Sequence, residues 1–228
     1  MRVTKGFVFA IAVTFVGMTA MTGAQRRGGN APEAPPANPA HTHIGHVMTT
    51  WKDTPGMTGF LPAAVADAKV AAAHAGLAAK SPDNLDAMKM HAGHVLNALD
   101  PTLMAKGPGS GYGVKKAAAG ALQHIGFAAK AETASPAVKT HATHVSTSLD
   151  DVIKWTDEAI ATAQKIQAST SAAEAAKLVT QLVDQTNAIA NGVDANKDGT
   201  IGWQAGEGGL AQAQTHMGLM MKAEGLQN

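Results

Sequence analysis

Residues 73–95 read AHAGLAAKSPDNLDAMKMHAGHV and predict two helices joined by a short turn. Alanine, leucine, methionine and lysine, which favour helices, dominate on both sides of the turn residues 81–84. Ser81 and Pro82 are typical of the capping residue and the first residue of a helix, which places the start of the second helix there. That helix carries apolar residues at steps of three and four, as a helix with one buried face requires, namely Leu85, Met88, Ala92, Val95 and Leu99. The stretch predicts an antiparallel helical hairpin.

Histidines recur along the chain in a pattern that contains this hairpin. The motif HxxHV occurs three times at steps of 48 and 50 residues, beginning at His43, His91 and His141. A lone histidine in an alanine- or methionine-rich run alternates with these pairs, at His74, His124 and His216. A fixed period indicates one supersecondary unit copied along the chain. We therefore expect an all-α, antiparallel bundle of six or seven helices built from repeated helical hairpins.

Hairpin geometry predicts which histidines meet. Residues at equal distances from the turn of an antiparallel hairpin lie side by side. The predicted sets are His74/His91/His94, His124/His141/His144 and, from the two ends of the chain, His216/His43/His46. Two imidazoles at positions i and i+3 of one helix, with a third from a neighbouring helix, suit a transition-metal ion such as copper, zinc, nickel or iron. Copper is favoured because soft thioethers lie close in sequence, at Met88, Met90 and Met220.

Two other interpretations of the histidines stay open. Pairs of them could be the axial ligands of haem b in an electron carrier, since alanine and glycine beside the histidines leave room for a porphyrin. The chain has few aromatic residues to line a haem pocket, which makes haem the second interpretation. In the third, each histidine is a half-exposed or hydrogen-bonded residue and each methionine fills the core of a structural protein. Threefold recurrence of one pattern favours metal ligands over this last interpretation.

The start of the chain predicts export. Residues 1–24 combine a basic beginning, an apolar stretch too short to span a membrane and a small-residue site, which is typical of a signal peptide cleaved after Ala24. Residues 25–40, QRRGGNAPEAPPANPA, predict a disordered tether, and the domain is expected from His41 to Asn228. Without Arg2 and Lys5, 16 basic residues face 17 acidic ones, which argues against a nucleic-acid-binding surface. We expect a periplasmic or secreted protein without membrane insertion.

The chain contains no cysteine, which excludes disulfides, thiolate zinc sites, iron–sulfur clusters and thioether-linked haem. Helices rich in alanine and lysine that carry alternating histidines, above all residues 73–95, resemble the small metal-binding protein family of periplasmic, histidine-rich helical bundles. The resemblance covers residues 63–150 and implies binding of copper or other divalent metals. This chain is longer than the family pattern and less dense in histidine, and it adds glycine clusters and an insertion.

The insertion, about residues 165–207, holds a second candidate cation site. Asp194 to Gly202, DANKDGTIG, resembles the first nine positions of an EF-hand calcium loop, with Gly199 at the tight turn. The twelfth position is Ala205 instead of glutamate, and Glu207 could close a longer loop. The alternative is a turn between two helices, stabilised by Asp and Asn side chains. We expect a structural calcium site with the ligands Asp194, Asn196, Asp198, Thr200 and Glu207.

Catalytic motifs are missing from the sequence. It contains no nucleophile elbow, phosphate-binding loop, dinucleotide fingerprint or HExxH motif. The sequence therefore predicts metal binding for buffering or delivery rather than an enzyme. The expected ligands are metal ions, and a redox or metal-transfer protein is the candidate partner.

Overall fold

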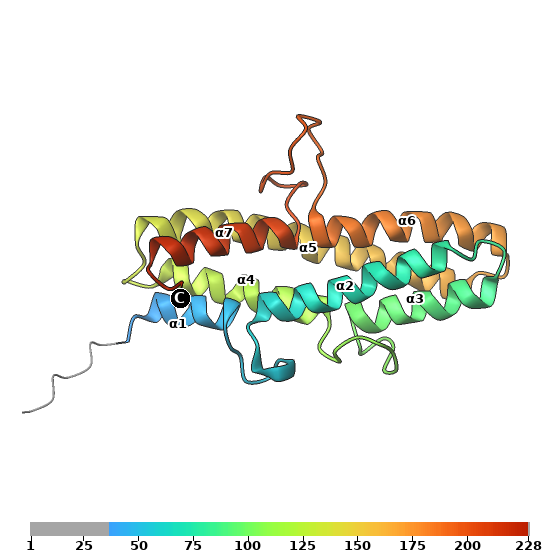
Figure 1. Ribbon diagram of the computed structural model, residues 1–228, viewed down its shortest axis with the longest axis horizontal. Helices are drawn as coiled ribbons and strands as arrows, with labels where there is room; N and C mark the ends of the chain where they lie inside the picture. Colours follow the sequence, from blue (N-terminus) through green and yellow to red (C-terminus); the bar gives the residue numbers. More distant parts are fainter. Residues whose placement is uncertain (1–36, 228) are drawn as a thin grey trace, which may run out of the picture. The chain divides into compact units, whose positions relative to one another are not determined.

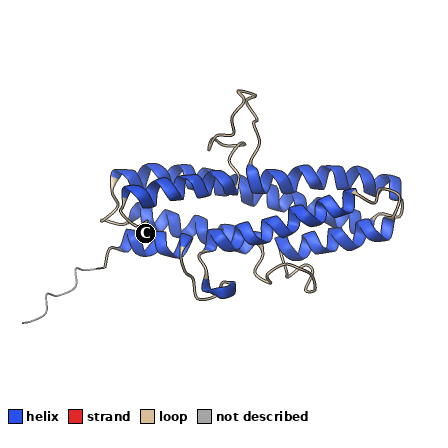
Figure 2. Ribbon diagram, in the orientation of Figure 1, coloured by secondary structure: helices blue, strands red, loops and turns tan. Residues whose placement is uncertain are grey.

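The computed structural model describes residues 37–227. The predicted signal peptide and residues 25–36 of the predicted tether lie outside the described residues. Seven α-helices and one short 3-10 helix (η1) make up the described chain: α1 (Pro39–Met48), η1 (Pro55–Met57), α2 (Phe60–Ala79), α3 (Leu85–Leu99), α4 (Val114–Lys130), α5 (Pro136–Ala168), α6 (Ala172–Asn191) and α7 (Leu210–Ala223). The described residues contain no strand (Figure 2), and the predicted all-α fold is confirmed.

Polar side chains cap several of these helices at their first turn. The Ser135 hydroxyl accepts a hydrogen bond from the Val138 amide at 3.1 Å, and Pro136 opens α5, as expected for a serine–proline pair. The predicted start of α3 at Ser81 is wrong, because Ser81 and Pro82 stay in the turn and Asn84 caps the helix. Asn38 caps α1, which begins two residues before the expected domain boundary at His41.

The longest helix, α5, organises the bundle. Its 33 residues run beside four other helices (Figure 1), with α4 and α7 along its N-terminal part and α3 and α6 along its C-terminal part. Helix α1 lies beside α4, and α2 lies beside α3 as the predicted hairpin requires. Each HxxH helix therefore has a helix with a lone histidine as its neighbour.

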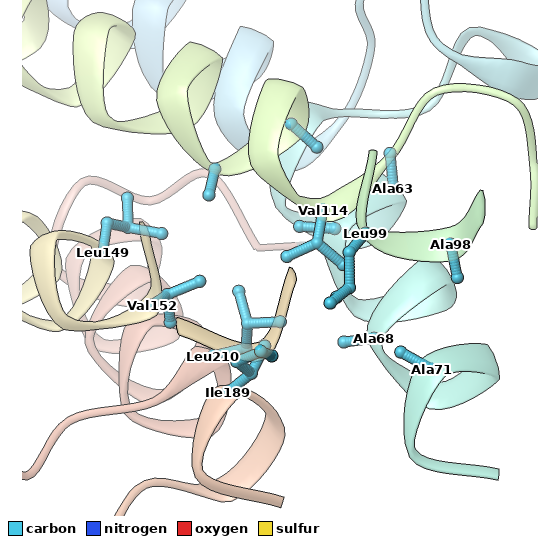
Figure 3. Close-up of a cluster of buried hydrophobic side chains, with 14 of the residues drawn as sticks. Ala63, Ala68, Ala71, Ala98, Leu99, Val114, Leu149, Val152, Ile189 and Leu210 are labelled. Carbon is cyan, nitrogen blue, oxygen red and sulfur yellow. The ribbon is translucent and has the colours of Figure 1, made fainter. Parts of the chain in front are cut away.

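Alanine dominates the core that holds these helices together. Figure 3 shows side chains from α2 to α7 meeting in one cluster, in which alanines such as Ala68 and Ala71 accompany larger residues such as Leu99 and Leu149. All four are at most 1% exposed. Small side chains let helix backbones approach closely, and close packing leaves little freedom for side chains at the seams. The histidines at the edges of this core are therefore held in place.

A buried aspartate fixes the loop between α3 and α4. Asp67 of α2 is 1% exposed, and its carboxylate accepts hydrogen bonds from the Ser110 amide (2.7 Å), the Ser110 hydroxyl (2.6 Å) and the Gly113 amide (2.9 Å). From α3, the Asn97 side chain donates to the Met104 carbonyl at 2.7 Å. The loop is thereby held against α2 and α3, and it carries Met104 to its position.

No helix among residues 37–227 is both long and apolar enough to cross a membrane.

Candidate metal centres

Nine of the ten histidines gather into three sets of three. In each set, one ring nitrogen of every histidine lies within 4.8 Å of the others. We call them site A (His43, His46 and His124), site B (His74, His91 and His94) and site C (His141, His144 and His216). The same donor set, two imidazoles from an HxxH helix and one from a second helix, thus occurs three times in the described chain.

The same nitrogen faces inward in all three sites. The Nδ1 atom of the lone histidine lies 3.0 and 3.1 Å from its two partners' Nδ1 atoms in site A, 3.0 and 3.2 Å in site B, and 3.2 and 3.3 Å in site C. Three nitrogens bonded to one ion at about 2.0 Å lie about 3.3–3.5 Å apart. The separations therefore come close to those of a three-nitrogen metal site.

Hydrogen bonding accounts poorly for this convergence. In a neutral imidazole, Nδ1 carries either one proton or one lone pair. In site B, the Nδ1 atom of His74 therefore cannot donate to His91 and also accept from His94. One linear hydrogen bond is the most it makes with the two rings. An ion bonded to three lone pairs would satisfy all the nitrogens together.

The helices explain why these rings meet. Residues i and i+3 lie on one helical face, so the pairs on α1, α3 and α5 each present two rings to one side. The lone histidines come from α4 at site A, α2 at site B and α7 at site C.

One of the three predicted groupings is found, and the other two are wrong. His74 meets His91 and His94, as hairpin geometry requires. His124, however, meets His43 and His46 instead of His141 and His144. The histidine that meets His141 and His144 is His216. Helices α4 and α5 do lie side by side, but the His124 face of α4 turns toward α1.

Burial favours the neutral form of six of the nine rings. It lowers the pKa of His46, His74, His91, His124 and His144 from 6.5, and neighbouring imidazoles lower these values further. The same two causes, with burial the larger, lower the pKa of His216 to about 4. Neutral imidazole is the form that binds metal. At neutral pH these six rings are therefore ready to act as ligands.

Comparison of the chain with protein-family models, with curated proteins and with solved structures finds no match. What the sites can do is therefore inferred from their own residues.

Aromatic rings surround site A. His124 is 8% exposed, and its ring centroid lies 4.8 Å from that of Trp51, 5.3 Å from Phe60 and 5.7 Å from Phe127. Helix α4 comes so close to Phe60 that a Cβ atom added at Gly120 would lie 2.4 Å from the ring. These aromatic neighbours were not predicted from the sequence, although Phe127 follows His124 by three residues within the repeat.

The other two sites have different neighbours. At site C, Trp203 from the loop between α6 and α7 stacks on His144. At site B, a pocket of about 220 Å³ is lined by His94, Met90, Met104 and Gln167, together with two lysines. Two of the three methionines singled out from the sequence, Met88 and Met220, are fully buried in the core.

The tenth histidine, His41, belongs to none of the three sites. Its Nε2 atom lies 2.8 Å from a carboxylate oxygen of Glu224, whose other oxygen accepts a hydrogen bond from the Ser135 hydroxyl at 2.5 Å. These contacts link the start of α1 to the end of α7 and the start of α5. They account for His41 as a structural residue.

The predicted calcium loop lies between α6 and α7. Glu207 is 3% exposed, and its carboxylate accepts hydrogen bonds from the Asn196 amide at 3.2 Å and the Gly202 amide at 3.1 Å. Asp198 accepts from the backbone and hydroxyl of Thr200, and Asp194 from the Gly199 amide. Within residues 37–227, the carboxylates of this loop do not form a group of three within 4.8 Å, as the histidines do. The calcium site stays a prediction.

Proposed function

We propose that this protein binds transition-metal ions, with copper favoured, at sites A, B and C, and that it buffers or delivers them outside the cytoplasm. The observation that carries the proposal is the convergence of three Nδ1 atoms in each site, with separations of 3.0–3.3 Å to the lone histidine. One such set would be a local coincidence of packing. Three sets of identical construction favour a shared chemical purpose.

The spacing of the nitrogens favours a bare ion over haem b. Two axial nitrogens on opposite faces of a haem lie about 4 Å apart, since each metal–nitrogen bond is about 2 Å long. The porphyrin ring would also have to lie between them. The Nδ1 atoms of His74 and His91, at 3.0 Å, leave no space for such a plane.

Copper is favoured by the soft donors near two of the sites. Met90 and Met104 line the pocket that reaches His94, and Met57 lines a pocket of about 300 Å³ that reaches His46. Thioethers bind Cu(I) more readily than harder ions. The proposal also includes export, which rests on residues 1–24, and transfer of the ion to a partner protein. We propose a binding protein and not an enzyme.

Metal analysis of histidine variants tests this function. Protein purified from its own host should contain copper by elemental analysis and show no Soret band, whereas a Soret band would support haem. Recombinant protein should bind about three ions per chain, one for each site. His74→Ala, His124→Ala and His216→Ala should each remove one ion, while the control His41→Ala should remove none. Full binding by all three variants would overturn the proposal.

We also propose a structural calcium ion in the loop Asp194–Gly202, closed by Glu207. The position of Glu207 supports the proposal, because backbone N–H groups of Asn196 and Gly202 hold its buried carboxylate against this loop, and carboxylate oxygens are ligands that calcium prefers. Calorimetric titration with Ca²⁺ should give heat with the unmodified protein and the control Asp184→Ala, but not with Asp198→Ala. Unchanged heats for Asp198→Ala would remove the site.

A further inference from the structure

The residue three positions after each lone histidine is large, apolar and partly exposed. It is Leu77 after His74, Phe127 after His124 and Leu219 after His216, with exposed fractions of 39%, 43% and 45%. The Phe127 ring centroid lies 5.2 Å from that of His43, so this position adjoins the metal ligands. The repeat thus presents three similar sites that differ at one corresponding side chain, aromatic at site A and aliphatic at sites B and C.

Aromatic residues concentrate at site A beyond this position. Residues 37–227 contain six Phe, Trp or Tyr side chains, and three of them, Trp51, Phe60 and Phe127, have ring contacts with site A histidines. Trp203 contacts site C, and no aromatic side chain other than histidine has a ring contact with site B within the described chain. The lone histidine of site A is also the most buried of the three, because His124 is buried while His74 and His216 are half-buried.

This difference affects how many ligands an ion can have. A zinc ion held by three histidines normally keeps a water molecule as its fourth ligand, and an ordered water needs polar partners. At site A, the rings of Phe60 and Phe127 beside His124 and His43 offer no such partner, and the polar residues Thr50 and Lys52 lie in the pocket beside His46. At site B, Gln167 and two lysines line the pocket that reaches His94 and offer polar partners to a water there, although the Gln167 side-chain nitrogen also donates to the Lys89 carbonyl. The aromatic side of site A, next to His43 and His124, therefore suits an ion that is satisfied by three nitrogens.

The charge of the ion acts in the same direction. The cost of transferring an ion from water into apolar surroundings rises with the square of its charge, so a divalent ion loses more than a monovalent one at site A. Attraction between a cation and the neighbouring aromatic rings offsets part of this transfer free energy. Cu(I) is monovalent, soft and stable with three nitrogen ligands.

We propose that site A selects Cu(I) over divalent ions through Trp51, Phe60 and Phe127, and that site B, without aromatic walls, accepts divalent ions more readily. The inference rests on the proposed metal-binding function and assigns the oxidation state to one of its sites. Methionines lie near both sites, Met57 in the pocket beside His46 and Met90 and Met104 in the pocket beside His94, so the difference between the sites rests on the aromatic side chains.

Full-length proteins that keep one site each provide the test. His74→Ala with His216→Ala leaves site A, and His124→Ala with His216→Ala leaves site B. The affinity of each for Cu(I) is measured by anaerobic competition with a chromophoric chelator, and the affinity for Zn²⁺ by calorimetry. The ratio of Cu(I) to Zn²⁺ affinity should be about tenfold higher at site A than at site B.

Reciprocal substitutions at the corresponding position then test the cause. Phe127→Leu in the site A protein should lower this ratio about three- to fivefold, and Leu77→Phe in the site B protein should raise it by a similar factor. Both positions are partly exposed, and circular dichroism verifies that the variants fold. Equal ratios at the two sites, or ratios that neither substitution changes, would overturn the inference alone. Absence of binding of both ions would overturn the proposed function with it.

Discussion

Trp203 stacks on His144, with the ring centroids 3.9 Å apart and the ring planes inclined by 20°. A copper ion at site C would lie within a few ångströms of this indole and should quench its fluorescence. Trp51, which lies 4.9 Å from His46, should report site A in the same way. We expect copper titration to quench single-tryptophan proteins that retain Trp51 or Trp203, and to leave one that retains Trp155 nearly unchanged.

The Trp155 protein is the matched control, because Trp155 belongs to α5 and has no ring contact with a histidine of the described chain. His216→Ala should abolish the quenching of Trp203 while Trp51 still responds. Equal quenching of all three tryptophans would indicate a nonspecific effect of copper and contradict the assignment of sites A and C.

Acidification should destabilise the metal-free protein. The pKa of His216 is lowered to about 4, and the pKa values of five other site histidines are also lowered below 6.5. Between the folded and unfolded pKa values the unfolded chain binds more protons, so stability is complete above pH 6.5 and falls as the pH drops toward 4. Thermal unfolding in the presence of a chelator should show the midpoint falling across this range. Replacement of His74, His124 and His216 by leucine should flatten the curve, and a midpoint that rose on acidification would contradict the burial of neutral imidazoles.

Removal of the Asp67 carboxylate should weaken the attachment of the loop between α3 and α4 to the bundle. Asp67→Ala leaves the Ser110 and Gly113 amides without their acceptor. Because hydrogen bonds to a buried charged group are strong, the free energy of unfolding should fall by about 3 kcal/mol in urea denaturation. Asp184→Ala, at an exposed position of α6, is the control and should change it by less than about 0.5 kcal/mol. Similar values for both variants would show that Asp67 does not anchor the loop.

Two glycines of α4 should respond to alanine in opposite directions. A Cβ atom at Gly120 would lie 2.4–2.8 Å from three atoms of the Phe60 ring, whereas one at Gly126 would meet nothing within 4 Å. Gly120→Ala should therefore cost about 1–3 kcal/mol and displace the aromatic wall of site A. Gly126→Ala should stabilise the helix by about 0.5–1 kcal/mol. Chemical denaturation measures both effects, and equal changes would contradict the close contact of α4 with Phe60.

Local patterns determined what could be predicted from the sequence. Apolar periodicity and helix-favouring composition predicted the helices, and the turn at 81–84 correctly placed His74 against His91. His124 lies at the edge of the apolar face of its helix, where a small rotation decides which of two neighbouring helices it meets. That choice depends on how α1, α4, α5 and α7 pack together, and no local pattern encodes it. The contact between Trp203 and His144 likewise depends on the path of a long loop.

The three sites also differ in how much of the chain each needs in order to form. In site B, the lone histidine lies 17 and 20 positions along the chain from its two partners. In sites A and C, the lone histidine lies 72–81 positions from its partners. Short loops close at lower entropic cost, and contacts between nearby residues form early in folding. Site B can therefore be complete once a single hairpin has folded, while sites A and C must wait for the bundle. An ion captured by the nascent hairpin would stabilise it before the remaining helices dock.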